Sequence, residues 1–273
     1  MTLSDNNVQR FLFGDLYDCQ LSWNSDFVFD AQVIVVMLVH DNGIEASRAI
    51  KSVLGQTGTT RFSLLIVDDT DSVEWKLHCQ ALLADNRIVL ATVPSCSVAQ
   101  ARNLALQIVK SEFSKSSWVS RLDADDELAH PCVLDEIIAE LDQCAENVCW
   151  ALAGNTLESD GLVLNRTNPA DESLLTQEGV LARLEGMAAG LPEAELPSCN
   201  LWIRTGFKAV YPDVGSAEDH WLVASLLLNQ RNQGKVLLGF VHAKYTLSGG
   251  ITQENRDNGA HHYSRINLYD SAI

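Results

Sequence analysis

The sequence is poor in basic residues and has no long hydrophobic run. Only 19 lysines and arginines stand against 36 aspartates and glutamates, which gives a formal net charge of -17. A surface of that charge repels a phosphate backbone or an anionic membrane, so we expect no nucleic-acid partner. No stretch approaches the ~18 consecutive apolar residues of a membrane-spanning helix, and the start of the chain has no signal-peptide pattern. We therefore expect a soluble protein with no transmembrane segment.

The cysteines show no sign of a disulfide framework. Their number, seven, is odd, they are scattered along the chain, and none belongs to a C-x-x-C pair. This usage is typical of reduced thiols, and we expect a cytoplasmic protein. The length of 273 residues and the hydrophobic content of 47% suit one α/β domain with a sizeable core, and they are compatible with a homo-oligomer.

Strand and helix patterns alternate through the first half of the chain. Continuous apolar, β-branched runs such as "QVIVVMLV" (32–39) predict strands that are buried on both faces. The segments between them carry apolar residues at helical spacing. We expect strands at 32–39, 62–67, 87–92 and 117–122, and helices near 45–55, 72–84, 97–110 and 132–142. The alternation predicts an α/β fold with a mostly parallel central sheet and helices on both faces.

The two ends of the chain are less regular. Residues 1–30 mix aromatic and acidic side chains without a sustained period, which indicates an N-terminal extension packed on the main domain. After residue 145 we expect strands at 148–153, 161–165, 199–203 and 235–241, and helices at 174–187 and 218–230.

Acidic residues follow three of the predicted parallel strands. They are Asp41, the pair Asp68 and Asp69, and the run "DADDE" at 123–127. The carboxyl ends of parallel strands meet at one edge of a sheet, where α/β proteins bind ligands. An acid at such a place often caps the next helix, but one acid suffices for each cap, and the run at 123–127 exceeds that need.

A divalent cation would offset the excess of acids. Mg²⁺ and Mn²⁺ prefer carboxylate oxygens, and Mg²⁺ is usually held by one or two carboxylates together with substrate phosphates. The sequence contains no G-x-x-x-x-G-K-[ST] motif, and no G-x-G-x-x-G follows the first strand, so neither a P-loop nor a dinucleotide fingerprint is present. We therefore expect a diphosphate-bearing ligand that arrives with Mg²⁺ or Mn²⁺.

Six motifs resemble those of the GT-A fold, family 2 type nucleotide-sugar glycosyltransferases. In order they are "VIVVMLVHDN", "AIKSVLGQT", "FSLLIVDDTD", "SVAQARNLAL", "WVSRLDADDEL" and "SAEDHWL". The resemblance is continuous over 32–130 and resumes at 198–250. It implies a donor-binding half at 31–130 and, in the same domain, an acceptor-binding half at 131–273 that includes a C-terminal closing loop with a hinge at Gly249-Gly250.

The resemblance also implies roles for the acids in the donor half. The first loop (His40, Asp41 and Asn42) and the acid pair Asp68 and Asp69 would line the pocket for the nucleotide base and ribose. Asp123-Ala124-Asp125 matches the family's D-x-D motif, in which Asp123 and Asp125 reach the metal, the ribose and the diphosphate.

Three further residues have two interpretations each. Arg102, in the family's A-R-N motif, would contact the donor or pack its helix. His242 would complete the metal shell or serve only the structure, as a lone histidine at a strand end usually does. Asp219 in Glu218-Asp219 matches the family's catalytic base, while acids also favour the first turn of a helix, and these two roles are compatible.

The sequence thus predicts a metal-dependent inverting glycosyltransferase. It would move a sugar from a nucleoside-diphosphate sugar to a small-molecule or glycan acceptor, with Asp219 as the general base. A non-catalytic nucleotide-sugar binding module is the alternative, and the presence of Asp219 argues against it. A D-x-D aspartyl phosphatase is disfavoured because its acid pair follows the first strand of its domain, and here the acids follow the fourth.

Overall fold

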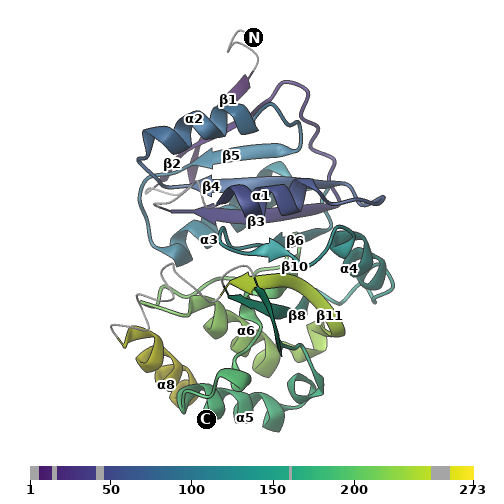
Figure 1. Ribbon diagram of the computed structural model, residues 1–273, viewed down its shortest axis with the longest axis vertical. Helices are drawn as coiled ribbons and strands as arrows, with labels where there is room; N and C mark the ends of the chain where they lie inside the picture. Colours follow the sequence, from purple (N-terminus) through teal and green to yellow (C-terminus); the bar gives the residue numbers. More distant parts are fainter. Residues whose placement is uncertain (1–5, 14–16, 41–45, 160–161, 247–258) are drawn as a thin grey trace.

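The computed structural model describes residues 6–13, 17–40, 46–159, 162–246 and 259–273. Asp41, Asn42 and the Gly249-Gly250 hinge lie outside these ranges. The described strands form one sheet in the order β1-β2-β5-β4-β3-β6-β10-β8-β11-β7, with β9 paired to β8 (Figure 1).

The centre of the sheet is parallel and comes from the regular first half of the chain. Its strands pair in the order β5-β4-β3-β6, and the four strands expected there from the sequence are confirmed. They are β3 (Val33–Val39), β4 (Phe62–Asp68), β5 (Ile88–Thr92) and β6 (Trp118–Arg121). Their side chains are buried on both faces because helices cover both sides of the sheet.

The sheet continues at both ends mainly with antiparallel pairs. On one side a hairpin of β1 (Asn6–Phe13) and β2 (Tyr17–Asn24) joins β5. The sequence indicated only a packed extension here, because the hairpin has no clean alternation and depends on pairing with β5. On the other side lie β10 (Leu201–Arg204), β8 (Trp150–Ser159), β11 (Gly234–Thr246), β7 (Glu127–Leu128) and β9 (Leu162–Asn168), where β8 and β11 are parallel to each other.

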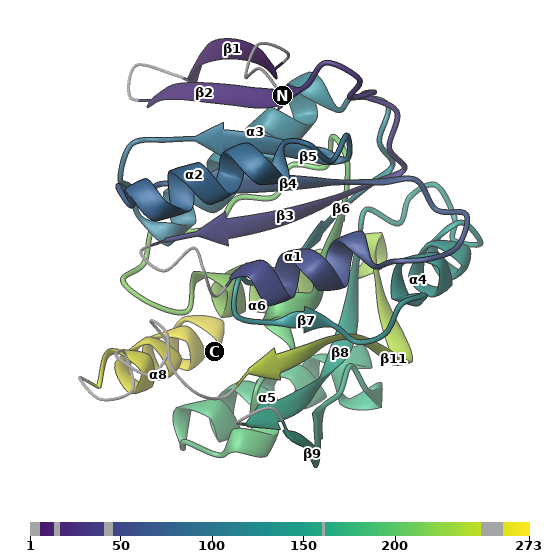
Figure 2. The same cartoon turned by 45° about the horizontal axis from the view of Figure 1, so that its top comes forward.

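Helices cover the two faces of the sheet and bury two separate cores (Figure 2). One face carries α1 (Ala46–Leu54), α2 (Val73–Leu82) and α4 (Val133–Leu141). The other carries α3 (Val98–Glu112), α5 (Gln177–Ala188), α6 (Glu218–Asn229) and α8 (Ala260–Ala272). Short 3₁₀ turns are η1 (Glu172–Leu175), η2 (Pro192–Ala194), η3 (Ser198–Asn200) and η4 (Arg231–Gln233). No helix among the residues described here is long and apolar enough to cross a membrane.

The acidic run lies between two strands that hold it at both ends. Strand β6 ends at Arg121, and β7 begins at Glu127. Strand β7 pairs with the end of β11, where Leu128 is opposite Ala243. Residues 122–126 therefore form a short loop at the carboxyl edge of the parallel strands, as the sequence predicted.

Candidate functional site

A buried arginine lies between the acidic loop and the start of α6. Arg121, the last residue of β6, is 5% exposed, and its Nη2 donates to Asp123 Oδ2 at 3.1 Å and to Asp219 Oδ2 at 3.0 Å. Arg121 was not among the site residues predicted from the sequence. A signal for it was present, because an arginine inside the apolar run "SWVSRL" must find an anionic partner if the strand is buried.

A second arginine reaches the same acids from α3. Arg102 is 9% exposed, pairs with Glu218, and lies 3.6 Å from Asp123 Oδ1 and 4.0 Å from Asp219 Oδ2. Its guanidinium also lies over the ring of Tyr211, at 5.4 Å from the centroid. Arg102 therefore packs its helix against the acidic cluster. Together with Arg121 it supplies part of the positive charge that was expected from a metal ion alone.

The start of α6 places Asp219 against these cations. The helix is preceded by Ala217, whose φ of 60° is uncommon for a residue with a side chain. Glu218 and Asp219 occupy the first turn, where the helix dipole favours negative charge. The turn at Ala217 thus directs both acids towards Arg102 and Arg121.

Both carboxylate oxygens of Asp219 accept hydrogen bonds. Oδ2 accepts from Arg121 and from Ser198 Oγ at 3.0 Å. Oδ1 faces the backbone nitrogen of His220 at 2.8 Å and its ring Nδ1 at 3.1 Å. Burial alone would raise the pKa of Asp219, but His220, Arg121 and Arg102 outweigh burial and hold the pKa well below its usual range. The predicted base is therefore ionised in this arrangement.

The acids of the loop differ in their surroundings. The side chain of Asp123 is 26% exposed, and Asp125 is half-buried at the mouth of the loop. Asp126 is buried, and its Oδ1 accepts from the Thr246 backbone at 2.8 Å. Burial, Asp125 and Asp123 raise the pKa of Asp126 well above its usual value, so this carboxyl tends to be neutral. Asp126 is therefore a structural link between the loop and the end of β11.

Arg48 of α1 holds the same loop from outside. Its Nη2 donates to the Asp125 carbonyl at 3.0 Å and to Thr246 Oγ1 at 2.9 Å. Its other nitrogens pair with Glu127 at 2.8 Å and Glu158 at 3.1 Å. Thr246 Oγ1 itself donates to the Asp125 carbonyl at 2.6 Å. The backbone conformation of the D-x-D loop thus depends on contacts from α1, β8 and β11.

The acid pair after β4 meets the end of β3. His40 Nδ1 lies 2.8 Å from Asp69 Oδ1, and the two side chains are 44% and 8% exposed. Asp68 is buried, accepts from the Thr70 backbone at 3.0 Å, and has its pKa raised by that burial. Of the expected pocket residues, the structure therefore joins His40 to Asp69 at the sheet edge and turns Asp68 inward.

His242, for which the sequence left a metal-ligand and a structural interpretation, has surroundings that fit the structural one. The residue is fully buried in β11, with Nε2 donating to the Arg121 carbonyl at 3.0 Å. Its ring packs edge-on against Trp202, with centroids 5.4 Å apart. Burial lowers the pKa of His242 to about 4. The ring is thus a neutral core group that supports the backbone of β6.

The carboxylates can take part in a metal site only with outside ligands. In the described part of the chain, no group of three or more histidine, cysteine or acidic side chains could hold a metal ion. Asp123 and Asp125 nevertheless offer hard oxygen atoms at a partly exposed edge. Such a pair fits Mg²⁺ or Mn²⁺ when water and substrate phosphates complete the shell.

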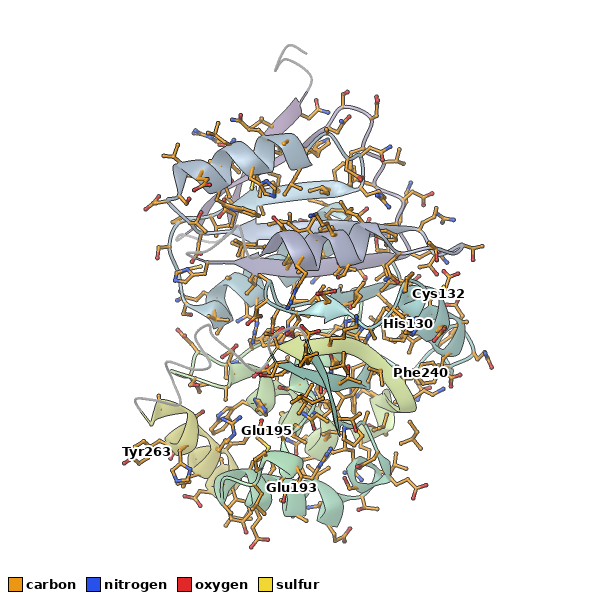
Figure 3. The ribbon with its side chains drawn as sticks, in the orientation of Figure 1. His130, Cys132, Glu193, Glu195, Phe240 and Tyr263 are labelled. Carbon is orange, nitrogen blue, oxygen red and sulfur yellow. The ribbon has the colours of Figure 1, made fainter. Side chains whose placement is uncertain are left out.

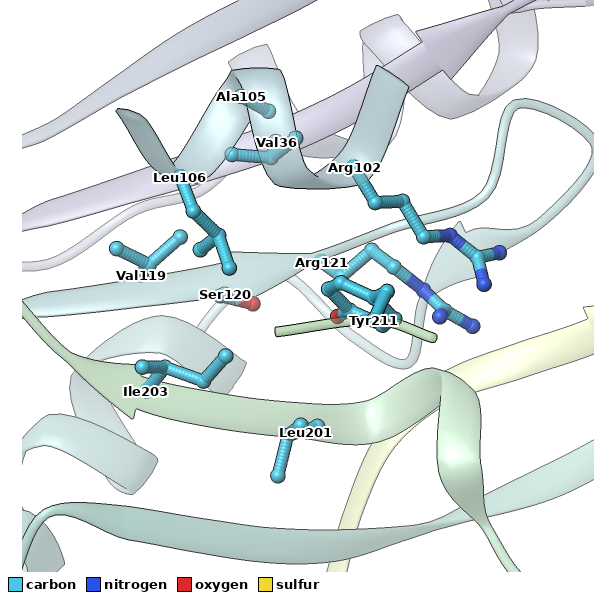
Figure 4. Close-up of a pocket in the computed structure, with 10 residues that line it drawn as sticks. All are labelled: Val36, Arg102, Ala105, Leu106, Val119, Ser120, Arg121, Leu201, Ile203 and Tyr211. Carbon is cyan, nitrogen blue, oxygen red and sulfur yellow. The ribbon is translucent and has the colours of Figure 1, made fainter. Parts of the chain in front are cut away.

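A small cavity lies behind the two arginines, between α3 and the sheet (Figure 4). Figure 4 shows the guanidinium groups of Arg102 and Arg121 side by side, with Tyr211 next to Arg121. The volume of about 20 Å³ accommodates about one water molecule. This cavity is therefore too small for a nucleotide.

Comparisons with known proteins give one family and several related folds. The model of the family described as "Glycosyl transferase family 2" matches residues 34–189. The structure of S. aureus TarS 1-349 with UDP-GlcNAc has a TM-score of 0.60 at 17% identity, covering 88% of this chain and 66% of that one. The mannosyltransferase PcManGT from Pyrobaculum calidifontis, solved with GDP-Man and Mn²⁺, has a TM-score of 0.55 at 13% identity, covering 88% and 65%.

The family match concerns the sequence of residues 34–189, and the structural matches concern the fold. At such identities, the likeness to solved structures concerns the fold alone. The chain spans 65% to 66% of the length of these solved relatives. A search of curated proteins returned no match.

Proposed function

The chain belongs to glycosyl transferase family 2, and from this we propose that it transfers a sugar from a nucleoside-diphosphate sugar to an acceptor hydroxyl with inversion at the anomeric carbon. The observation that carries the proposal is the joint hold of Arg121 on Asp123 and Asp219. One of these acids belongs to the motif for the donor and the other to the motif for the base. Because both acids contact Arg121, the proposed donor residue and the proposed base lie close together, as an in-line displacement requires.

The proposed organisation follows the two parts of the chain. Residues 31–130 would bind the donor, and residues 131–273 would bind the acceptor and close over the site, with residues 1–30 as a packed extension. TarS was solved with UDP-GlcNAc and PcManGT with GDP-Man. Both ligands are nucleotide sugars, which supports this class of donor for the present chain.

The donor half would use residues at the ends of β3, β4 and β6. The exposed His40 and its largely buried partner Asp69 would meet the base and ribose, while the buried Asp68 would hold their loop. Asp123 and Asp125 would hold Mg²⁺ or Mn²⁺, which when bound would neutralise charge on the departing diphosphate. Arg102 and Arg121 place fixed positive charge next to Asp123.

Asp219 would act on the acceptor. The acceptor oxygen attacks the anomeric carbon, its proton passes to Asp219, and the bond from that carbon to the diphosphate oxygen breaks, which releases the nucleoside diphosphate. Ser198 Oγ is a neutral donor to Asp219 Oδ2, whereas Arg121 is charged. The serine bond is thus the weaker of the two and the one an acceptor hydroxyl would replace.

A panel of UDP, GDP, dTDP and CDP sugars with Mn²⁺ tests the proposal. A ligand that binds the folded state raises the melting temperature, so at least one sugar should give a shift. Incubating that donor with candidate acceptors should then yield product. In Asp219→Asn the shift should persist while transfer falls by roughly 10²-fold or more. A shift without transfer in the native protein would identify a binding module, and the absence of any shift would refute the proposal.

A further inference from the structure

The candidate base, Asp219, is the first of a series of charged side chains in contact with one another. His220 Nδ1 lies 3.1 Å from Asp219 Oδ1, and His220 Nε2 lies 3.1 Å from Glu195 Oε2. Arg265 Nη2 lies 2.7 Å from both carboxylate oxygens of Glu195. The order is therefore Asp219, His220, Glu195 and Arg265, and it links α6 through the segment after η2 to α8.

The geometry favours the charged form of the His220 ring. A neutral imidazole carries one N–H, so one of its nitrogens would present a lone pair to a carboxylate oxygen at 3.1 Å. Only the imidazolium form donates to Asp219 and Glu195 together. The side chain is 12% exposed, so water does little to screen the two acids. Burial would lower the pKa of His220, but Asp219 and Glu195 outweigh burial and raise the pKa to about 9.

Other charged or titratable groups face this chain from each neighbouring element. Asp219 contacts Arg121 of β6, Arg102 of α3 and the Ser198 hydroxyl of η3. Burial raises the pKa of Tyr211, and the charge of Asp219 adds to that rise. Glu218, next to Asp219, is paired with Arg102. Arg102 and Arg121 thus each contact more than one acid, whereas the acids beside the His220 ring are Asp219 and Glu195; Ser198 Oγ also lies 3.3 Å from His220 Nδ1.

The far end of the chain is anchored by the C-terminal helix. The side chain of Arg265 is 4% exposed, and α8 is also tied to the loop before α6 by Ser264 Oγ, which donates to the Ser216 carbonyl at 2.5 Å. Figure 3 shows Glu195 on the inner side of α8 and Tyr263 on its outer side. The helix therefore holds Glu195 in place for the His220 ring.

We propose that His220 is a positioning residue for Asp219, an imidazolium fixed by Glu195 and Arg265 that orients the Asp219 carboxylate and keeps it ionised. This inference rests on the proposed function, in which Asp219 takes the proton of the acceptor. Because His220 already carries its proton, it does not accept a second one from Asp219. Its contribution is to extend the range of acidic pH over which the base is active.

The first test measures the ring itself and needs no substrate. In protein labelled with ¹⁵N-histidine, the His220 resonances should remain those of an imidazolium through neutral pH and titrate near pH 9. Glu195→Gln removes one of the two carboxylates and should lower the titration midpoint of the ring. A midpoint at the ordinary histidine value in the native protein would overturn the inference, whatever the activity of the protein.

The second test uses nucleoside-diphosphate release from whichever sugar of the panel raises the melting temperature. In His220→Gln the acid limb of the plot of kcat/KM against pH should move to higher pH. Near about pH 5, kcat/KM of this variant should be roughly tenfold below its own plateau value. His262→Gln is the matched control, because His262 is exposed on α8, and its profile should equal that of the native protein.

The outcomes separate the two proposals. An unchanged acid limb in His220→Gln, with Asp219→Asn inactive, refutes the positioning role and leaves the base assignment standing. Full activity in Asp219→Asn refutes the base assignment. In that case the titration of the His220 ring still tests whether the ring is an imidazolium between Asp219 and Glu195. If His220→Gln fails to fold, both measurements, the titration of the His220 ring and the pH dependence of kcat/KM, can be made on Glu195→Gln.

Discussion

Arg121 Nη2 lies 3.0 Å from Asp219 Oδ2 and donates to Asp123 from the same atom. One cation therefore serves the D-x-D motif and the candidate base, which come from different halves of the chain. The arginine is 5% exposed and fully surrounded by protein. Its charge stabilises the pair of acids, and the acids in turn stabilise the buried guanidinium.

Replacing Arg121 should therefore destabilise the whole domain. Arg121→Met leaves Asp123 and Asp219 without their shared partner, and breaking a buried ion pair from one side costs about 3–5 kcal/mol. Urea unfolding should show a lower midpoint with an unchanged slope. Arg61→Met is the control: Arg61 is 63% exposed and 3.7 Å from Asp30, so the change should be within about 0.5 kcal/mol. Equal stability of the two variants would contradict the role of Arg121.

Asp125 and His242 should differ in their effect on the metal. Asp125→Ala should abolish the Mn²⁺ dependence of nucleoside-diphosphate binding in titration calorimetry, because it removes a carboxylate from the loop edge. His242→Gln should lower the melting temperature and leave the Mn²⁺ dependence intact, since the ring is enclosed in the core. Loss of the Mn²⁺ dependence in a folded His242→Gln protein would identify the histidine as a metal ligand.

Arg48 should control metal-dependent binding without touching the metal. Arg48→Lys keeps the charge but cannot serve Glu127, Glu158, Thr246 and the Asp125 carbonyl together. Loss of such supporting contacts typically weakens metal affinity by about 10–100-fold. Calorimetry with Mn²⁺ and the nucleoside diphosphate measures this effect. Lys51→Met, an exposed position on the same helix, is the control and should bind normally.

The charge on His220 should make stability depend on pH above neutrality. The folded-state pKa of about 9 exceeds the ordinary value of 6.5, so this stabilisation is complete below about pH 6.5 and is lost as the pH rises through 9. The native protein should lose up to about 3 kcal/mol of unfolding free energy over that window from this residue. His220→Gln should lack this loss, whereas His262→Gln should keep it. Urea unfolding at a series of pH values measures this loss. If the unfolding free energy of His220→Gln fell with pH as steeply as that of the native protein, the assignment would be contradicted.

Local patterns in the sequence predicted the elements that form the site. The strands β3, β4 and β6 were recognisable because a parallel strand buried on both faces is continuously apolar over its short length. The acids after them stood out because they exceeded the number needed to cap helices. Family membership followed from six motifs in register and is confirmed by the family match over residues 34–189.

Elements that depend on distant partners were not visible in this way. The hairpin of β1 and β2 is a strand pair only because β5 offers an edge. Helix α8 has no clear apolar stripe, and its place depends on contacts such as that of Arg265 with Glu195. The sequence left two interpretations of His242, because its burial depends on the pairing of β11 with β7 and β8.

The sequence by itself determined the order of the parallel strands in the chain, the edge at which the acids gather and the family, because those depend on local periodicity and on motifs within one segment. The tertiary structure alone decided which acids are ionised. Asp219 is held as an anion by Arg102, Arg121 and His220, whereas Asp126 is buried with two acids beside it and tends to be neutral. The state of a carboxyl depends on burial and on charges within a few ångströms, and folding brings those charges together from remote parts of the chain.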